Sequence, residues 1–302
     1  MSGSAAPPYV GRFAPSPTGA LHFGSLVAAL GSWLDARVQG GEWLLRVEDL
    51  DPPREVAGAA QRQLATLSAF GLHSDRDVLW QSQRHERYQE VLQQLLTLDL
   101  AFACSCTRSD LAGEAHHGCL RPFDPKHHAV RLRVPNRAIN VCDRLRGDCQ
   151  QHPYADGGDV VLRRADGPYA YQLAVVVDDH DQQVTDVVRG ADLLDSCGRQ
   201  NLLYEALGWP IPRYLHLPLI TDDAGRKLSK SSADLPVDDN APLPALALAW
   251  RALGQADGLL PRHGSAETWL RAAQEHFDWR RIEHDGAIRS NMIQSDMTKQ
   301  ID

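Results

Sequence analysis

Two short segments that lie far apart in the sequence, residues 22–25 and 227–231, constrain the fold of this chain more than any other feature. The first reads H-F-G-S and opens a stretch of helical spacing, where backbone N–H groups and the helix dipole favour an anion. The second reads K-L-S-K-S and offers two lysines together with hydroxyl groups. A chain that uses both segments on one phosphate-bearing ligand must fold so that they converge.

The apolar pattern around the first segment indicates an α/β sheet. Residues 9–13 read as a short buried strand, and Leu26, Leu30 and Leu34 fall on one face of the helix that follows. A strand, a turn and a helix in this order begin many nucleotide-binding sheets. Further elements alternate in the same way: strands at 43–47, 78–80 and 184–188, and helices at 55–70, 85–98 and 192–207. Such alternation is typical of a parallel sheet.

The α/β pattern breaks near residue 101 and resumes near residue 166. We therefore expect a parallel sheet in two halves, residues 9–100 and 166–240, separated by an irregular insertion at 101–165 that is rich in Cys, His, Pro and Arg. Within the second half, a strand or hairpin from residue 217 leads into the lysine segment. Residues 241–302 are expected to form a short helical region.

Composition excludes several classes of protein. No apolar run approaches the roughly 20 residues that span a bilayer. The N-terminal residues lack the basic start and the apolar stretch of a secretory signal. We therefore expect a cytoplasmic protein without membrane contact. The net charge of −8 argues against a protein that coats nucleic acid. Basic residues gather between 121 and 146, either as a local RNA-facing surface or as a salt-bridged one.

The two opening segments together fit transfer of a nucleotide from ATP to a carboxylate. His22 can donate a hydrogen bond to a phosphate oxygen, and Gly24 allows close approach. Lys230 is the principal candidate cation and Lys227 the second, because preorganised charges lower such a barrier by about 3–4 kcal/mol per donor. The other expected ATP contacts are Ser25, Leu228, Ser229 and Ser231. Each segment alone could be a surface turn, but the run R-F-A-P-S-P-T-G at 12–19 makes the pair specific.

Three of the six cysteines, Cys104, Cys106 and Cys119, lie close together in the insertion, with His116 and His117 between them. Zinc prefers four tetrahedral sulfur and nitrogen ligands, and closed sites of this kind are structural. We therefore expect one structural Zn²⁺ held by the three cysteines and one of the two histidines. Three free thiols are the alternative.

These motifs resemble those of the class I aminoacyl-tRNA synthetases, in particular their glutamyl branch. The similar segments are R-F-A-P-S-P-T-G with the L-H-F-G that follows at 21–24, R-V-E-D-L-D at 46–51, Y-A-Y-Q-L-A at 169–174, V-R-G-A-D at 188–192 and L-P-L at 217–219. The resemblance covers about residues 9–235. It implies a Rossmann-type parallel sheet with a zinc-bearing insertion, and a ligase that uses ATP with Mg²⁺.

The glutamyl resemblance also implies an amino acid pocket. Arg12 and Arg189 are candidates for binding carboxylates through the guanidinium fork, Glu48 for pairing with the ammonium group and Tyr171 for donating its hydroxyl. A structural ion pair is the alternative for each. In the family, the positions that match Arg12, Phe13, Ala14, Pro15, Ser16, Glu48, Tyr171 and Arg189 contact glutamate. Asp49, Asp51 and Asp192 either hold ribose or Mg²⁺, or cap helices.

The cysteine cluster departs from the family's pattern, in which C-x-C is often followed by a Tyr and, four residues later, a Cys. Here Ala115 lies four residues before Cys119. If one loop residue is deleted, His116 takes the tyrosine's place. The implied ligand set is then Cys104, Cys106, His116 and Cys119, with His117 as the alternative to His116.

Only residues 232–302 follow the lysine segment, which is too short for the helical region with which full glutamyl-tRNA synthetases read the anticodon. We therefore expect no anticodon-binding domain. The chain is similar to truncated members of the branch, which activate L-glutamate without needing tRNA and attach it to queuosine in the anticodon of tRNA(Asp). We expect that activity, in a monomer. The alternatives are charging of a tRNA 3′ end and a non-catalytic relative that binds glutamate or ATP.

Overall fold

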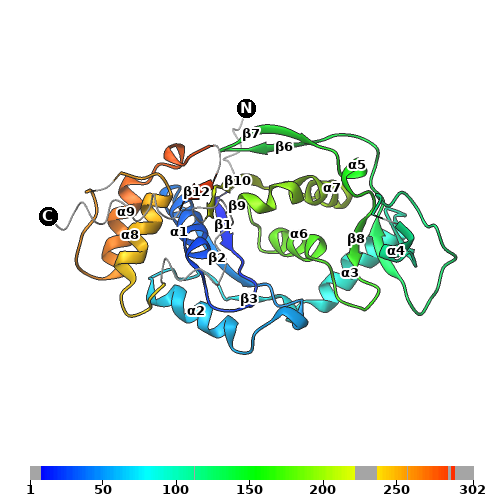
Figure 1. The fold of residues 1–302 in the computed structure, drawn as a ribbon, viewed down its shortest axis with the longest axis horizontal. Coiled ribbons are helices and arrows are strands. Elements are labelled where there is room, and N and C mark those ends of the chain that lie inside the picture. The colour runs from blue at the N-terminus through cyan, green and yellow to red at the C-terminus, as the bar shows by residue number, and fades with distance from the viewer. Residues whose placement is uncertain (1–7, 112, 222–236, 257, 285–286, 290–302) are drawn as a thin grey trace.

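The computed structural model describes residues 8–111, 113–221, 237–256, 258–284 and 287–289. Figure 1 shows an elongated molecule with a sheet near its centre. Helices α8 (Pro242–Ala252) and α9 (Ala266–His276) form one end, and the region of α4 (Arg108–Leu111) and β8 (Val160–Arg163) forms the other. None of the helices among the described residues is both long and apolar enough to cross a membrane.

The central sheet has the expected two halves. One half has the parallel order β1 (Val10–Phe13), β2 (Glu42–Val47), β3 (Leu79–Trp80). The other half has the order β7 (Gly147–Gln151), β6 (Ile139–Asp143), β10 (Arg213–Leu217), β9 (Asp186–Gly190), parallel except for β7. The halves meet at β1 and β9, where the Thr185 N–H donates to the Val10 carbonyl at 2.9 Å. Ligands of such sheets bind at the carboxyl ends of the strands, where the strand order reverses.

The helices of the two halves are α1 (Phe23–Val38), α2 (Ala59–Ala69), α3 (His85–Thr97), α6 (Tyr171–Asp181) and α7 (Cys197–Leu207). Two of them are shorter than the sequence predicts. The helix expected from residue 55 begins at Ala59, because Gly58 adopts a left-handed φ of 70° and Pro52–Arg54 forms a separate 3₁₀ turn. The helix expected over 192–207 is divided into a 3₁₀ segment, Ala191–Ser196, and α7.

The segment between the halves, which was expected to be irregular, contains several strands. β4 (Ala101–Cys104), β5 (Ala129–Leu132) and β8 form a small antiparallel sheet, which lies with α4 and α5 (Pro153–Asp156). The hairpin β6–β7 instead extends the central sheet, since Asp143 of β6 pairs with Tyr214 of β10. Along β6, Ile139, Val141 and Asp143 are buried in alternation with exposed residues. Residues 139–151 therefore belong in space to the second half of the sheet.

Two large clusters of buried apolar side chains hold the molecule together. One surrounds α1 and packs it against α8 and α9, and the other joins α3, α6 and α7 to the small sheet. Trp250 and Trp269 are buried in the first cluster, with ring centroids 6.0 Å apart. The strand expected at 217–221 is present as β11 (Leu219–Thr221), paired with β12 (Ala287–Arg289). The hairpin expected beyond Thr221 lies outside the described residues.

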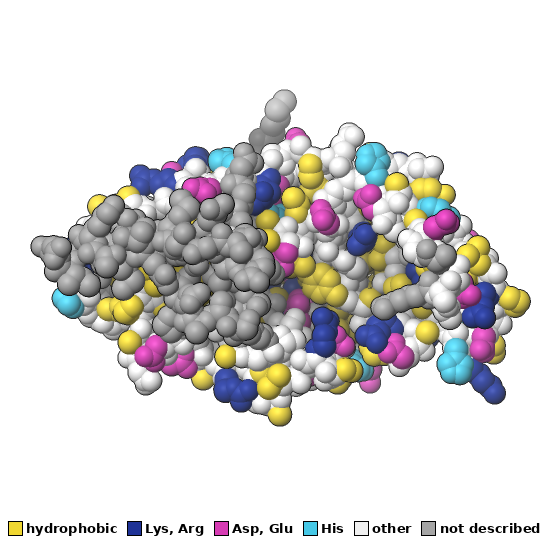
Figure 2. Space-filling view, in the orientation of Figure 1, with side chains coloured by type: hydrophobic (Ala, Val, Ile, Leu, Met, Phe, Trp, Pro, Cys, Tyr) yellow, Lys and Arg dark blue, Asp and Glu magenta, His cyan; other side chains and the backbone are white. Residues whose placement is uncertain are grey.

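Basic side chains between residues 121 and 146 form salt bridges. Arg121 pairs with Asp110, Arg133 with Asp99, Arg137 with Glu205 and Arg144 with Asp35. On the face shown in Figure 2, Lys and Arg are interspersed with Asp and Glu over the described residues. The salt-bridged alternative therefore accounts for these arginines.

Candidate active site

A cavity of about 290 Å³ opens at the carboxyl ends of β1 and β9, beside the N-terminus of α1. All the residues expected to contact glutamate line it: Arg12, Phe13, Ala14, Pro15, Ser16, Glu48, Tyr171 and Arg189. His22, Gly24 and Ser25 line it as well. Lys227, Leu228, Ser229, Lys230 and Ser231 lie outside the described residues, so their convergence with His22 stays a prediction.

Arg12 is fixed by a buried carboxylate that sequence reasoning did not identify. Its Nε donates to Asp179 Oδ1 at 3.1 Å, and Arg46 Nη2 donates to the same oxygen at 2.6 Å. All three side chains are almost fully buried. Burial raises the pKa of the Asp179 carboxyl, but the two guanidiniums outweigh it and hold that pKa below its ordinary value. Asp179 is therefore a charged bridge between β1, β2 and α6.

Arg189 is held from one side only. Its Nε donates to His216 Nε2 at 3.0 Å, and its Nη2 donates to Gln200 Oε1 at 2.9 Å, to Cys197 Sγ at 3.0 Å and to the Leu193 carbonyl at 3.2 Å. Its Nη1 faces the Tyr171 hydroxyl at 3.4 Å. These hydrogen-bond partners are all neutral, although only 5% of Arg189 is exposed. The buried cation therefore lacks a carboxylate in direct contact among the described residues, and the side of Arg189 at the cavity is Nη1.

Glu48 follows β2 and lines the cavity, as does Tyr171 of α6. Burial raises the pKa of the Glu48 carboxyl to about 7, although Arg46 and Arg12 lower it in part. Burial also raises the pKa of the Tyr171 hydroxyl above its ordinary value. At neutral pH, Tyr171 is thus a hydrogen-bond donor, and Glu48 is poised between its charged and neutral forms.

His22 caps the N-terminus of α1. The Ser25 N–H donates to His22 Nδ1 at 3.1 Å, so the neutral ring has its proton on Nε2, 3.1 Å from Ser25 Oγ. A Cβ at position 24 would lie 3.2 Å from the His22 ring, so the absence of a side chain at Gly24 avoids a close contact with the ring. The arrangement presents an N–H donor beside the positive end of a helix, as expected from the sequence.

Gln63 of α2 also lines the cavity and was missed by the sequence analysis. Its amide nitrogen donates to the Gly19 carbonyl at 2.7 Å and to the Ser16 carbonyl at 3.1 Å, which braces the loop between β1 and α1. This fixes the amide orientation and leaves Oε1 buried without a hydrogen-bond partner. The side chain is only 3% exposed, so this acceptor is shielded from bulk water.

The three acidic residues left open by the sequence differ in position. Asp49 accepts hydrogen bonds from the backbone N–H and hydroxyl of Ser82, and Asp51 pairs with Arg54. Asp192 alone of the three lines the cavity. Asp49 and Asp51 therefore stabilise nearby turns, whereas Asp192 lies where a ribose or a metal-bound phosphate could reach it.

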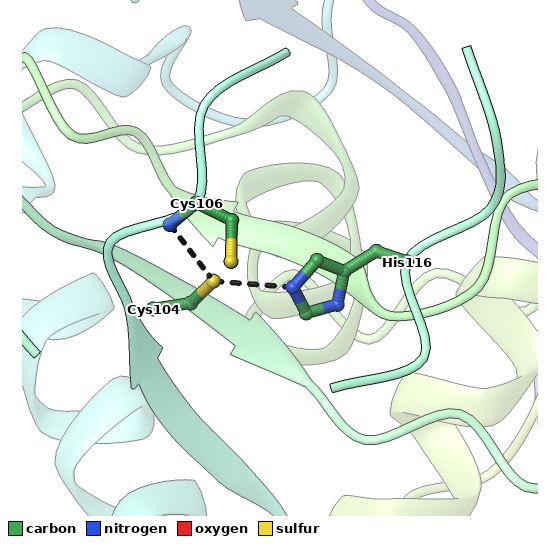
Figure 3. A group of neighbouring side chains, drawn as sticks. All are labelled: Cys104, Cys106 and His116. Atoms are coloured by element: carbon green, nitrogen blue, oxygen red, sulfur yellow. Dashed lines mark hydrogen bonds between the residues drawn. The ribbon is translucent and has the colours of Figure 1, made fainter. Parts of the chain in front are cut away.

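Three of the four expected zinc ligands converge at the end of β4. The ligand atoms of Cys104, Cys106 and His116 lie within 4.8 Å of one another, and Figure 3 shows the two sulfurs directed toward the imidazole ring. Cys104 Sγ lies 3.2 Å from His116 Nε2. Cys119 is exposed and its Sγ lies 3.7 Å from the Ala103 carbonyl, outside that group. The ring of His117 instead stacks on Tyr154, with centroids 4.0 Å apart.

A second contact fits a metal at this cluster. His116 Nδ1 lies 2.9 Å from Asp159 Oδ2, so the carboxylate can accept a hydrogen bond from Nδ1–H, which leaves the Nε2 lone pair free to bind a cation. A sulfur, sulfur, nitrogen donor set with this support suits Zn²⁺. Of the two histidines left open by the sequence, His116 is the one placed with the cysteines.

The fold and the cavity agree with a family comparison. The family model described as "tRNA synthetases class I (E and Q), catalytic domain" matches residues 9–121 and 120–241. The matched residues include both halves of the central sheet and the cavity between them. They define a class I tRNA synthetase catalytic domain, the domain of a family of ligases.

Curated relatives narrow this class. Glutamyl-Q tRNA(Asp) synthetase of Xanthomonas axonopodis pv. citri (strain 306) is 60% identical over 274 residues, which are 90% of this chain and 91% of that protein. The protein of the same name from Pseudomonas putida KT2440 is 53% identical over 253 residues, 82% of this chain and 84% of that one. The chain therefore belongs to the glutamyl-Q tRNA(Asp) synthetase family of class I synthetases.

Solved structures agree at lower identity. A glutamate tRNA ligase from Elizabethkingia meningosepticum CCUG26117, determined in complex with its amino acid, is 26% identical with a TM-score of 0.76. It covers 96% of this chain, and the chain covers 70% of it. A glutamate-tRNA synthetase from Elizabethkingia anophelis gives a TM-score of 0.77, also at 26% identity, covering 97% and 71%. The resemblance inferred from the sequence motifs is thus confirmed at the level of the family.

Proposed function

We propose that this protein activates L-glutamate with ATP, without tRNA, and transfers the glutamyl group to queuosine in the anticodon of tRNA(Asp). The main observation in favour is the cavity itself, which sets Arg12, Arg189, Glu48 and Tyr171 beside the N-terminus of α1. A site for an amino acid with two carboxylates is thereby joined to a site for phosphates.

The charges of the cavity match those of glutamate. Arg189 is a buried cation whose direct partners are neutral, so a substrate carboxylate would supply its missing counter-charge. Because Nε and Nη2 are already used, that carboxylate is shared between Nη1 and the Tyr171 hydroxyl rather than held by the whole fork. Glu48 takes the ammonium group, and Arg12, steadied by Asp179, assists the other carboxylate.

In the first step, an oxygen of the glutamate α-carboxylate attacks the α-phosphorus of ATP. The new bond is carboxyl oxygen to phosphorus, the bond from that phosphorus to the bridging oxygen breaks, and pyrophosphate leaves with the bonding electrons. His22 Nε2 can donate to a phosphate oxygen while its Nδ1 is held by Ser25. Lys227 and Lys230 are expected to stabilise the charge on the phosphates, and Mg²⁺ bound with ATP neutralises part of it.

In the second step, a hydroxyl group attacks the activated carbonyl and AMP leaves. Queuosine as the acceptor rests on the family resemblance and on the names of the relatives at up to 60% identity. We expect the small sheet β4–β5–β8 to be the part of the chain that approaches the RNA. A structural Zn²⁺ would stabilise this sheet, bound by Cys104, Cys106 and His116, with Cys119 as the fourth expected ligand.

Two assays test the proposal. Glutamate-dependent exchange of pyrophosphate into ATP without tRNA is expected, and its absence would favour a non-catalytic binding protein. Labelled glutamate should then be transferred to purified tRNA(Asp) that carries queuosine and not to the same tRNA lacking it. Equal transfer to both would instead indicate charging of the 3′ end.

A further inference from the structure

Three buried polar residues form a line behind the cavity. Asp143, His216 and Arg189 belong to β6, β10 and β9, which are consecutive strands of the sheet. Asp143 Oδ2 lies 2.6 Å from His216 Nδ1, and His216 Nε2 lies 3.0 Å from Arg189 Nε. None of the three is more than 5% exposed. The line therefore connects the hairpin β6–β7 to the guanidinium at the cavity.

Only one arrangement of protons satisfies both contacts. A guanidinium nitrogen can only donate, so His216 Nε2 must be the acceptor and the ring proton must lie on Nδ1. That proton is donated to Asp143, whose carboxylate also accepts the backbone N–H groups of Leu145, Arg146 and His216 at 2.8–2.9 Å. Burial lowers the pKa of His216, which favours the same neutral ring.

The described residues around His216 do not offer the Nε of Arg189 another nitrogen or oxygen acceptor. Cys197 Sγ lies 3.6 Å from His216 Nε2, the Tyr214 ring stacks on the imidazole with centroids 5.8 Å apart, and Arg146 Nε donates to the His216 carbonyl. Without the imidazole, the Nε donor of Arg189 would be left unpaired, and the guanidinium would be held through Nη2 alone, about which it could pivot. Nη1 would then lose its direction toward Tyr171.

We propose that His216 is a positioning residue for the carboxylate subsite, in which its Nδ1–H tautomer, selected by Asp143, fixes Arg189 so that Nη1 faces the cavity. The inference rests on the proposed function only in naming a substrate carboxylate as the group that Nη1 meets. It assigns the hairpin β6–β7 a role in amino acid binding through Asp143, although no residue of that hairpin lines the cavity.

Paired substitutions of His216 test the proposal through glutamate-dependent exchange of pyrophosphate into ATP. His216→Leu removes the acceptor and should raise the glutamate KM about tenfold or more, with the ATP KM nearly unchanged. His216→Gln can place Oε1 near the former Nε2 and should restore the glutamate KM to within about threefold of wild type. Equal effects of Leu and Gln, or parallel rises in both KM values, would overturn the positioning role.

A matched control separates positioning from loss of packing. Tyr214→Phe keeps the ring beside His216 but removes the hydroxyl that donates to Asn201 at 2.9 Å. It should lower the melting temperature while leaving the glutamate KM unchanged. A rise in glutamate KM as large as that of His216→Leu would show that any defect in this core produces the effect.

The tautomer can be observed without substrate. In protein labelled with ¹⁵N-histidine, the signal that disappears in His216→Gln should show a protonated Nδ1 and a bare Nε2 at neutral pH. A proton on Nε2, alone or on both nitrogens, would overturn the proposal. If the wild type showed this tautomer but no glutamate-dependent exchange, the proposed function would fail while the hydrogen-bonded line would stand.

Discussion

Protonation of Glu48 should control glutamate binding near neutral pH. The carboxyl is buried at the cavity, and burial raises its pKa from the ordinary 4.5 to about 7 despite Arg46 and Arg12. Below that pH the group is neutral and cannot pair with the substrate ammonium. Glutamate must then displace the proton, so its apparent affinity should fall about tenfold for each pH unit below 7.

The same pKa predicts a stability effect with a defined sign. The folded state holds the Glu48 proton more tightly than the unfolded chain does, so ionisation of Glu48 costs stability as the pH rises from 4.5 to 7. The rise in pKa corresponds to about 3 kcal/mol, an upper bound because Arg12 and Arg46 can relax. Glu48→Gln should therefore gain stability relative to wild type above pH 7 and show little difference below pH 5.

The assay is glutamate-dependent pyrophosphate exchange between pH 6 and 8, with urea unfolding from below pH 5 to pH 8. The wild-type glutamate KM should be about tenfold higher at pH 6 than its plateau value, whereas Glu48→Gln should bind weakly at every pH. Glu42→Gln, at the exposed start of the same strand, is the control and should keep the wild-type profile. A wild-type KM that is constant over this range would refute the reasoning.

Three further changes have expected outcomes. Arg189→Ala leaves His216 Nε2 and Gln200 Oε1 without their donor and should raise the glutamate KM by about 100-fold. The ATP KM should be unchanged, and initial-rate measurements with each substrate varied would check both values. Asp179→Asn should lower the free energy of unfolding, measured in urea, by about 3–5 kcal/mol, because two buried guanidiniums lose their shared counter-charge. The control is Asp181→Asn at a more exposed position, and an equal decrease in the free energy of unfolding for both variants would contradict this. Purified protein should contain one equivalent of zinc, and less than half an equivalent would argue against the site. Both chelation and Cys104→Ser should lower the melting temperature, whereas the control Cys142→Ser, at an exposed position of β6, should not.

Periodicity predicted the central sheet because its strands and helices are long enough to show their apolar faces. The helix that begins at Phe23 and the strands at the cavity were expected within a few residues. The hairpin β6–β7 was missed because one of its strands is largely exposed and polar, so its pairing with the sheet depends on β10, far along the chain. Long-range pairing of this kind leaves little trace in local sequence.

The cavity residues likewise include some that local sequence predicts and others that depend on long-range contacts. Those expected at the cavity lie in contiguous motifs, and every described one of them lines it. The residues that orient them were not expected, because Asp179, His216 and Gln63 belong to none of those motifs. Asp143 lies in the segment that looked irregular. Their partners become evident only when strands distant in sequence are brought side by side.

The two arginines of the cavity show why these orienting residues matter for chemistry. Arg12 shares the charge of Asp179 with Arg46, so its own charge is balanced in part within the protein. Among the described residues, the hydrogen-bond partners of Arg189 are all neutral, and a protonated His216 would place a second cation against it. A buried cation of this kind is costly unless an anion joins it. The neutral imidazole therefore keeps Arg189 in place without neutralising it, which leaves its charge for a ligand carboxylate.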